Sequence, residues 1–125
     1  MTEAGRGLFG RVDAMYRYLV MNYQLGVVGK AIDALDRAER RQLIELADKK
    51  ANGTSESART SAEAFGRVRS SNAQMRLHGI VQWITAITAE TKDSPNGDFQ
   101  EINKRTQRLM RQVRDSLPRS ATRAA

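Results

Sequence analysis

The chain has 125 residues, enough for one domain with a modest hydrophobic core, and carries 21 basic against 14 acidic side chains. The resulting net charge of +7 favours phosphate, anionic lipid or acidic protein partners. The absence of cysteine excludes a disulfide framework, a thiolate zinc site and a cysteine nucleophile.

The N-terminal part of the chain is predicted to form two helices. Residues 1–7 are expected to be flexible. Gly26 and Gly29 each weaken a helix by about 1 kcal/mol relative to alanine, so we expect a second helix to begin near residue 27 or 30 and to reach residue 35. The first helix is predicted over residues 8–23 from apolar side chains at helical spacing, namely Leu8, Val12, Met15, Leu19 and Tyr23.

The next helix has a recognisable start and end. Asp36 is followed three positions later by Glu39, the spacing of a capping box, which predicts a helix start at this point. Asn52-Gly53 predicts its end, because these residue types accept left-handed backbone conformations. The pattern leaves open whether Asp36 separates two helices or lies within one.

Residues 55–91 are predicted to form a long helical stretch, because apolar residues recur at steps of three and four. As one rod it would be on the order of 50 Å long. Ser70-Ser71-Asn72 is its weak point, since these side chains compete for backbone hydrogen bonds, and a kink there would give two helices. Residues 92–97 contain Ser94-Pro95-Asn96-Gly97 and predict a surface loop.

The last helix is predicted over residues 99–117. Asp98-Phe99-Gln100-Glu101 is a second capping pattern, and Pro118 ends the helix. Residues 119–125 are expected to be flexible. We therefore expect an all-α protein, a single compact bundle of four to five helices over residues 1–125, with a long central helix and a basic amphipathic C-terminal helix.

The positive charge is concentrated in residues 99–125, which hold seven basic and two acidic side chains. On a helix Lys104, Arg108 and Arg111 fall within about 60° of one another, opposite an apolar face. Arginine can direct two hydrogen bonds to one phosphate, although most such charge runs are simply solvated helix faces. The candidate nucleic-acid-binding residues here are Lys104, Arg105, Arg108, Arg111 and Arg114.

Two further basic groups are secondary candidates for phosphate contact. Arg40 and Arg41 lie at a helix start, where cations oppose the helix dipole, so ion pairs are an alternative explanation. Arg67, Arg69 and Arg76 have few acids nearby and either follow a phosphate backbone or are solvated.

Aromatic and methionine side chains in the first helix indicate packing in the core or against another subunit. Met15, Tyr16 and Tyr23 are the candidate interface residues there. Trp83 is expected to anchor the core or an interface, and we include it among the interface candidates.

Catalytic and metal chemistry find no support in the residue pattern. The single histidine, His78, has no acid within one helical turn. The segment from Gly26 to Ala31 lacks the first glycine and the Ser/Thr of a phosphate-binding loop. We expect no enzyme activity, no cofactor and no metal ion.

In size, predicted helicity, absence of cysteine and its capped, arginine-rich last helix, the chain resembles the small subunits of CRISPR effector complexes, including those of type IV systems. That resemblance implies several copies along a guide-RNA complex, with basic faces toward RNA or single-stranded DNA. It carries no diagnostic motif and transfers no site residue.

We expect a cytoplasmic, non-catalytic nucleic-acid-associated subunit with copies of itself as partners. It has no membrane partner, because no apolar run approaches the length of a span and the N-terminus lacks a secretory pattern. The alternative is a protein-interaction module, such as a bacterial or phage regulator or chaperone, whose basic face binds an acidic partner.

Overall fold

Five helices account for almost all of the residues that the computed structural model describes, which are 3–50 and 58–118, with side chains over 10–49 and 61–118. No strand occurs in these ranges. The predicted all-α bundle is confirmed. In chain order the helices are α1 (Glu3–Asp33), α2 (Arg37–Lys50), α3 (Ala58–Val68), α4 (Ala73–Thr91) and α5 (Gly97–Asp115).

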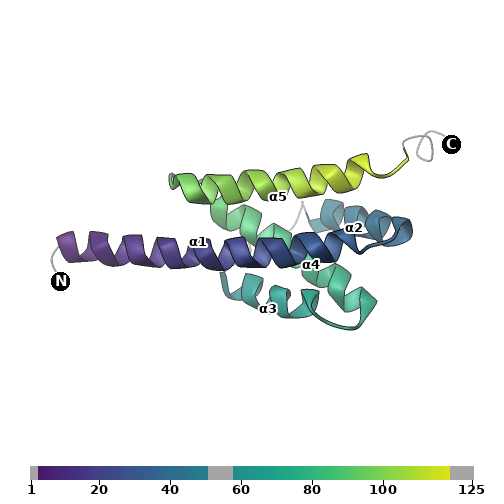
Figure 1. Cartoon of the computed structure of the whole chain (residues 1–125), viewed down its shortest axis with the longest axis horizontal. Helices are drawn as coiled ribbons and strands as arrows, with labels where there is room; N and C mark the ends of the chain where they lie inside the picture. The colour runs from purple at the N-terminus through teal and green to yellow at the C-terminus, as the bar shows by residue number, and fades with distance from the viewer. Residues whose placement is uncertain (1–2, 51–57, 119–125) are drawn as a thin grey trace.

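The longest helix is α1, but α4 lies at the centre of the bundle and packs against each of the other four helices. α5 runs along one side of α1, α3 lies on the other side, and α4 crosses between them (Figure 1). The N-terminal part of α1 projects beyond the other helices (Figure 1). Residues 3–7, which were expected to be flexible, belong to this helix.

The predicted break near Gly26 and Gly29 is wrong, since α1 continues through both residues. Leu25, Val28 and Ile32 on the inner face are at most 3% exposed. Burying three large aliphatic side chains stabilises the helix by more than two glycines weaken it, because each burial contributes about 1.5–3 kcal/mol. Tertiary packing therefore decides the length of α1.

Within the predicted stretch 55–91, the described residues 58–91 form two helices, the second of the two predicted outcomes. Asn72 is the N-cap of α4, and its Oδ1 accepts a hydrogen bond from the Met75 amide at 3.0 Å. The Ser70 hydroxyl accepts a hydrogen bond from the Asn72 backbone N–H at 3.0 Å, as expected for side chains that compete with helical hydrogen bonding. The predicted long central helix is therefore wrong for this segment.

α3 folds back on α4 at a glycine. A Cβ atom built on Gly79 would lie 2.6 Å from the Val68 amide nitrogen and 2.7 Å from the Arg67 Cβ. Only a residue without a side chain lets the end of α3 approach α4 so closely. Gly79 thus fixes the packing of these two helices.

The capping box at the start of α2 is confirmed. The Asp36 carboxylate accepts a hydrogen bond from the Glu39 backbone amide at 2.8 Å, and the Glu39 carboxylate accepts one from the Asp36 backbone amide at 3.1 Å. These reciprocal bonds satisfy two backbone donors that the helix itself leaves free. Asp36 thus separates α1 from α2. The predicted ends at Asn52-Gly53 and over residues 119–125 lie outside the described residues, as do residues 1–2.

The predicted cap of α5 is wrong by two residues. Asn96 caps the helix, and its Oδ1 accepts hydrogen bonds from the backbone amides of Asp98 at 2.8 Å and Phe99 at 3.3 Å. Asp98 instead lies in the first turn, where a carboxylate suits the helix dipole. The Gln100 amide group donates to the carbonyl oxygens of Thr91 and Ser94, so the loop is held against the start of the helix.

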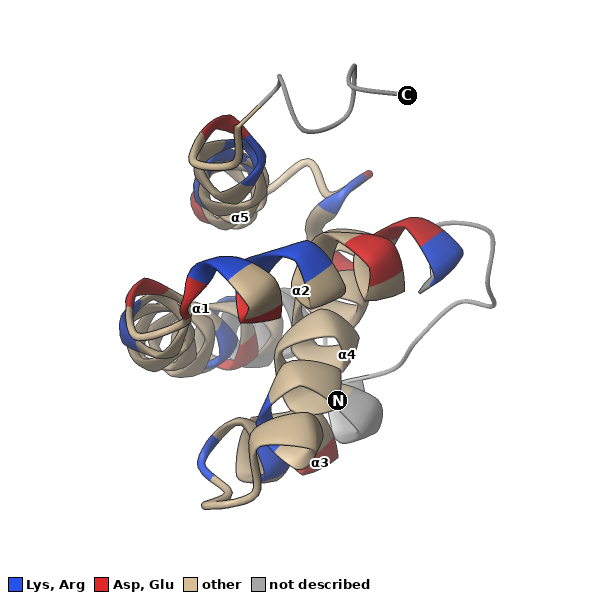
Figure 2. Cartoon of the chain, turned by 90° about the vertical axis from the view of Figure 1, so that its right-hand side faces the viewer, with Lys and Arg blue, Asp and Glu red and all other residues tan. Residues whose placement is uncertain are grey.

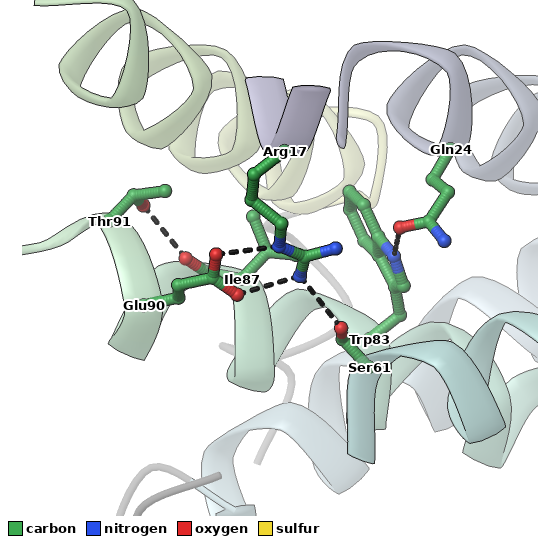
Figure 3. Close-up of polar contacts among 7 residues, drawn as sticks. All are labelled: Arg17, Gln24, Ser61, Trp83, Ile87, Glu90 and Thr91. Atoms are coloured by element: carbon green, nitrogen blue, oxygen red, sulfur yellow. Dashed lines mark hydrogen bonds and ion pairs between the residues drawn. The ribbon is translucent and has the colours of Figure 1, made fainter. Parts of the chain in front are cut away.

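Trp83 lies in the core. Its side chain is fully buried, and its indole Nε1 donates to the Gln24 Oε1 at 2.9 Å (Figure 3). A buried indole needs such an acceptor, because an unsatisfied N–H would cost about 1–3 kcal/mol. The assignment of Trp83 to an interface is therefore wrong, since no surface of this residue is left for a partner.

An ion pair joins α1 to α4. Arg17 donates to both carboxylate oxygens of Glu90 and, through Nη2, to the hydroxyl of the buried Ser61 at 3.0 Å (Figure 3). Three helices therefore meet at one guanidinium group. This contact fixes α1 just where it leaves the bundle.

Candidate nucleic-acid interface

α5 is held firmly on the bundle by its inner face. Ile102 and Val113 are at most 2% exposed, and Asn103 donates through Nδ2 to the Thr91 hydroxyl at 3.1 Å. The Thr91 hydroxyl itself donates to the Ile87 carbonyl oxygen at 2.7 Å. This apolar and polar anchoring gives the opposite face of α5 a fixed position.

The predicted basic stripe of α5, made of Lys104, Arg108 and Arg111, lies on that outer face. Lys104, Arg108 and Arg111 are exposed, and none of them has a hydrogen-bond or ion-pair partner within the described part of the chain. The acids of α5 lie toward its ends, at Asp98, Glu101 and Asp115. Residues 104–111 therefore carry four cations and no acid, although Glu101 and Asp115 lie one helical turn from Lys104 and Arg111.

Arg105 flanks the stripe on the side of α1. Its Nη1 donates to the Asn22 Oδ1 at 2.5 Å, which fixes the guanidinium while leaving its charge unneutralised, because the partner is an amide. A hollow of about 180 Å³ opens between α1 and α5, and Arg105 and Arg108 both line it. An anion entering this hollow would meet two guanidinium groups.

Arg114 flanks the stripe on the side of α2. Its Nη2 lies 2.6 Å from the Asp48 Oδ1, and the two side chains are 47% and 59% exposed. Such an exposed ion pair contributes at most about 1 kcal/mol, so a phosphate can displace the carboxylate. Arg105 and Arg114 thus lie on opposite flanks of the exposed cations Lys104, Arg108 and Arg111, and each is held by a neighbouring helix.

Arg67, Arg69 and Arg76 are not part of this surface. Arg67 lies at the end of α3, Arg69 in the turn after it and Arg76 near the start of α4. α3 and α5 lie on opposite sides of α4 (Figure 2). Arg67 donates to the Gln82 Oε1 at 2.7 Å and Arg76 to the Ser70 carbonyl oxygen at 3.0 Å, so both hold the hairpin together. Only Arg69 of the three is exposed.

Arg40 has a structural partner that sequence reasoning missed. It donates through Nε to the Leu35 carbonyl oxygen at 3.2 Å and through Nη2 to that of Asp33 at 3.4 Å. A cation at the end of α1 satisfies carbonyl groups that the helix leaves free and suits its dipole. Arg41 is exposed.

A second exposed surface lies on α1 and contains the three remaining predicted interface residues. Met15, Tyr16 and Tyr23 are all more than half exposed, and the Tyr23 ring stacks edge-on against Phe65 at 6.0 Å between centroids. Val12 and Leu19 are exposed on the same face and were not singled out, although their helical spacing was visible in the sequence. We call Val12, Met15, Tyr16, Leu19 and Tyr23 the α1 stripe.

His78 is exposed on α4. Over the described side chains, no three His, Asp or Glu residues gather closely enough to hold a metal ion. Among the described helices, none combines the length and apolar character that crossing a membrane requires.

Comparison with known protein families, with curated proteins and with solved structures finds no match for this chain.

Proposed function

We propose that this protein is a non-catalytic, cytoplasmic subunit of a nucleic acid–protein assembly, and that the outer face of α5 contacts the phosphate backbone. The observation that carries the proposal is the set of exposed cations Lys104, Arg108 and Arg111, which have no anionic partner in the described part of the chain. Exposed cations on a rigid helix attract a polyanion without any reorganisation of the protein.

The geometry favours backbone contact over base recognition. From Lys104 to Arg114 the helix rises about 15 Å, which is long enough to contact several successive phosphates of one strand. The two arginines of the stripe can each direct two hydrogen bonds to a phosphate. Among the described side chains no aromatic ring lies on this face to stack with a base, since Phe99 is half-buried on the inner side. RNA or single-stranded DNA is the proposed ligand.

The resemblance to CRISPR effector small subunits adds a larger context to this proposal. In that setting several copies would line a guide-RNA complex, each with α5 toward a strand. Its support is the helical bundle, the small size and the net charge of +7.

The test is binding of fluorescent single-stranded RNA, single-stranded DNA and duplex DNA at several salt concentrations. We expect the wild-type chain to bind single strands, with an affinity that falls as salt rises. The double variant Arg108→Glu/Arg111→Glu should bind at least tenfold more weakly and lower the salt slope by about 1.4. Absence of wild-type binding to all three ligands at low salt, or an unchanged double variant, would overturn the proposal.

The second candidate function is a protein-interaction module whose basic face binds an acidic protein. The Arg114–Asp48 ion pair favours this second function, because a cation on the flank of this face already forms an ion pair with a protein carboxylate. A synthetic poly-glutamate chain in the same assay separates the two candidates. Binding of poly-glutamate as tight as that of RNA at equal salt would favour the protein partner.

A further inference from the structure

The hollow between α1 and α5, two helices that run side by side (Figure 1), has an apolar floor and a polar edge. It measures about 180 Å³ and is lined by Leu25 of α1 and by Arg105, Arg108, Leu109 and Gln112 of α5. Leu25 is 3% exposed and Leu109 is half-buried against the core, so these two side chains form the floor. Arg108 and Gln112 are exposed and form the edge. We call this site the α1–α5 hollow.

Two glycines of α1 lie beside the α1–α5 hollow. Asn22, Gly26 and Gly29 fall within about 60° of one another around the helix. Asn22 accepts the hydrogen bond of Arg105, and a Cβ atom on Gly29 would lie 3.9 Å from the Leu109 Cδ2, so this side of α1 faces the hollow. Gly26 lies between them, and a Cβ atom there would meet no atom within 4 Å. A glycine within a helix weakens it relative to alanine, and here the missing side chain leaves space.

The size of the α1–α5 hollow suits one part of a polymer. Sites that enclose a whole small molecule usually measure about 300–1,000 Å³, more than this hollow offers. The hollow is still several times larger than the roughly 30 Å³ of one water molecule, so it has room for a planar ring. Its floor of Leu25 and Leu109 favours a ring over a phosphate, because apolar surface gains nothing from contact with an anion.

We propose that the α1–α5 hollow binds one unstacked nucleobase of the strand whose phosphates lie on the basic stripe of α5. This inference rests on the proposed function, since it requires a strand on α5. Arg108 belongs to both the stripe and the hollow, so a strand on the stripe passes beside the opening. The face of the base contacts Leu25 and Leu109, and the guanidinium plane of Arg105 can stack on it.

The polar edge accepts any base. The Gln112 side chain has both hydrogen-bond donors and an acceptor, so it can pair with the edge of each of the bases. Binding therefore stays independent of sequence. Arg105 is already held in place by Asn22, which reduces the ordering that binding requires.

The α1–α5 hollow distinguishes a single strand from a duplex. In a duplex each base is stacked and paired, and moving one out of the stack costs free energy. The bases of a single strand can be splayed out without breaking a pair. The cations of α5 attract both kinds of nucleic acid, so the hollow supplies the preference for single strands that the charges alone do not give.

Comparison of an oligothymidine with an abasic single strand of equal length tests the base contact, because the two carry the same charge. We expect the wild-type chain to bind the oligothymidine at least about fivefold more tightly, the lower end of what stacking one base contributes. The salt slopes of the two strands should agree. Equal affinities with a retained salt dependence would overturn the base contact and leave the proposed function standing. Absence of binding to both strands at low salt would overturn both.

The variant Gly26→Leu tests the place of the contact without removing a charge. The new side chain enters the space beside Asn22 and Arg105, since helical side chains lean toward the preceding turn. Affinity for the oligothymidine should fall about fivefold to that for the abasic strand, with the salt slope unchanged. Gly66→Leu on α3 is the matched control, because a Cβ atom there also meets nothing within 4 Å, and it should keep the preference. Circular dichroism confirms that both variants are folded. A preference that persists in Gly26→Leu would contradict the proposal.

Methyl NMR of the full chain locates the base directly. Addition of the oligothymidine should shift the methyl signals of Leu25 and Leu109, whereas the abasic strand should leave them in place. The Leu77 methyl groups are the internal control, because this α4 side chain is fully buried in the core. Base-dependent shifts that spare Leu25 and Leu109 would place the base on another surface and refute the assignment of the hollow.

Discussion

The guanidinium group of Arg17 meets both carboxylate oxygens of Glu90, with Nε 2.7 Å from Oε2 and Nη2 2.6 Å from Oε1. Both side chains are 21% exposed, so the pair is largely shielded from water. Such a bidentate ion pair has a defined geometry, and it fixes how α1 packs against α4.

Loss of one partner should destabilise the bundle. We expect Arg17→Met to lower the free energy of unfolding by about 1–3 kcal/mol, because it leaves the Glu90 carboxylate shielded and unpaired. The double variant Arg17→Met/Glu90→Leu should lose less than the sum of the two single variants. Urea unfolding of all four proteins gives the coupling free energy, and strict additivity would contradict the pairing.

Gly79 should be the glycine least tolerant of a side chain. Gly79→Ala places a Cβ 2.6 Å from the Val68 amide nitrogen and 2.7 Å from the Arg67 Cβ, closer than van der Waals contact, and we expect it to lower stability by about 1–3 kcal/mol. Gly66→Ala, on the other helix of the same hairpin, meets no atom within 4 Å and should raise stability by about 0.5–1 kcal/mol. Thermal unfolding compares the two. Equal effects would mean that the close approach of α3 to α4 does not exist.

The start of α5 offers a direct comparison of two capping assignments. Asn96→Ala should lower stability by about 1 kcal/mol, because it removes the acceptor for the amides of Asp98 and Phe99. Asp98→Ala should cost less, about 0.3–1 kcal/mol, since only its interaction with the helix dipole is lost. Urea unfolding measures both variants, and a larger effect of Asp98→Ala would place the cap at Asp98.

Arg108 and Arg69 test which basic surface contacts nucleic acid. Each is exposed, and each replacement by alanine removes one positive charge. Arg108→Ala should lower the salt slope of single-strand binding by about 0.7, the value for one lost phosphate contact. Arg69→Ala, on the opposite side of the bundle, should leave the slope unchanged. The reverse result would place the strand on the α3–α4 hairpin.

What could be predicted from the sequence depends on short-range interactions. The capping box of Asp36 and Glu39 joins residues three apart, and the break at Ser70-Ser71-Asn72 comes from side chains bonding to nearby backbone. The amphipathic character of α5 also follows from spacing along one helix. These features are visible in sequence because each partner lies within a few residues of the other.

Only the tertiary structure decided the rest, because the partners are distant in the chain. Gln24 bonds to Trp83 across 59 positions and Asn22 to Arg105 across 83, so neither the burial of the indole nor the fixing of that arginine has a local signal. α1 stays helical through its glycines because Leu25 and Val28 are buried by other helices. The sequence by itself determined the all-α class, the capping box at the start of α2 and the face of α5 that carries charge. Packing determined which cations are left without partners and which apolar face of α1 is left uncovered, since both depend on what the folded chain places beside them.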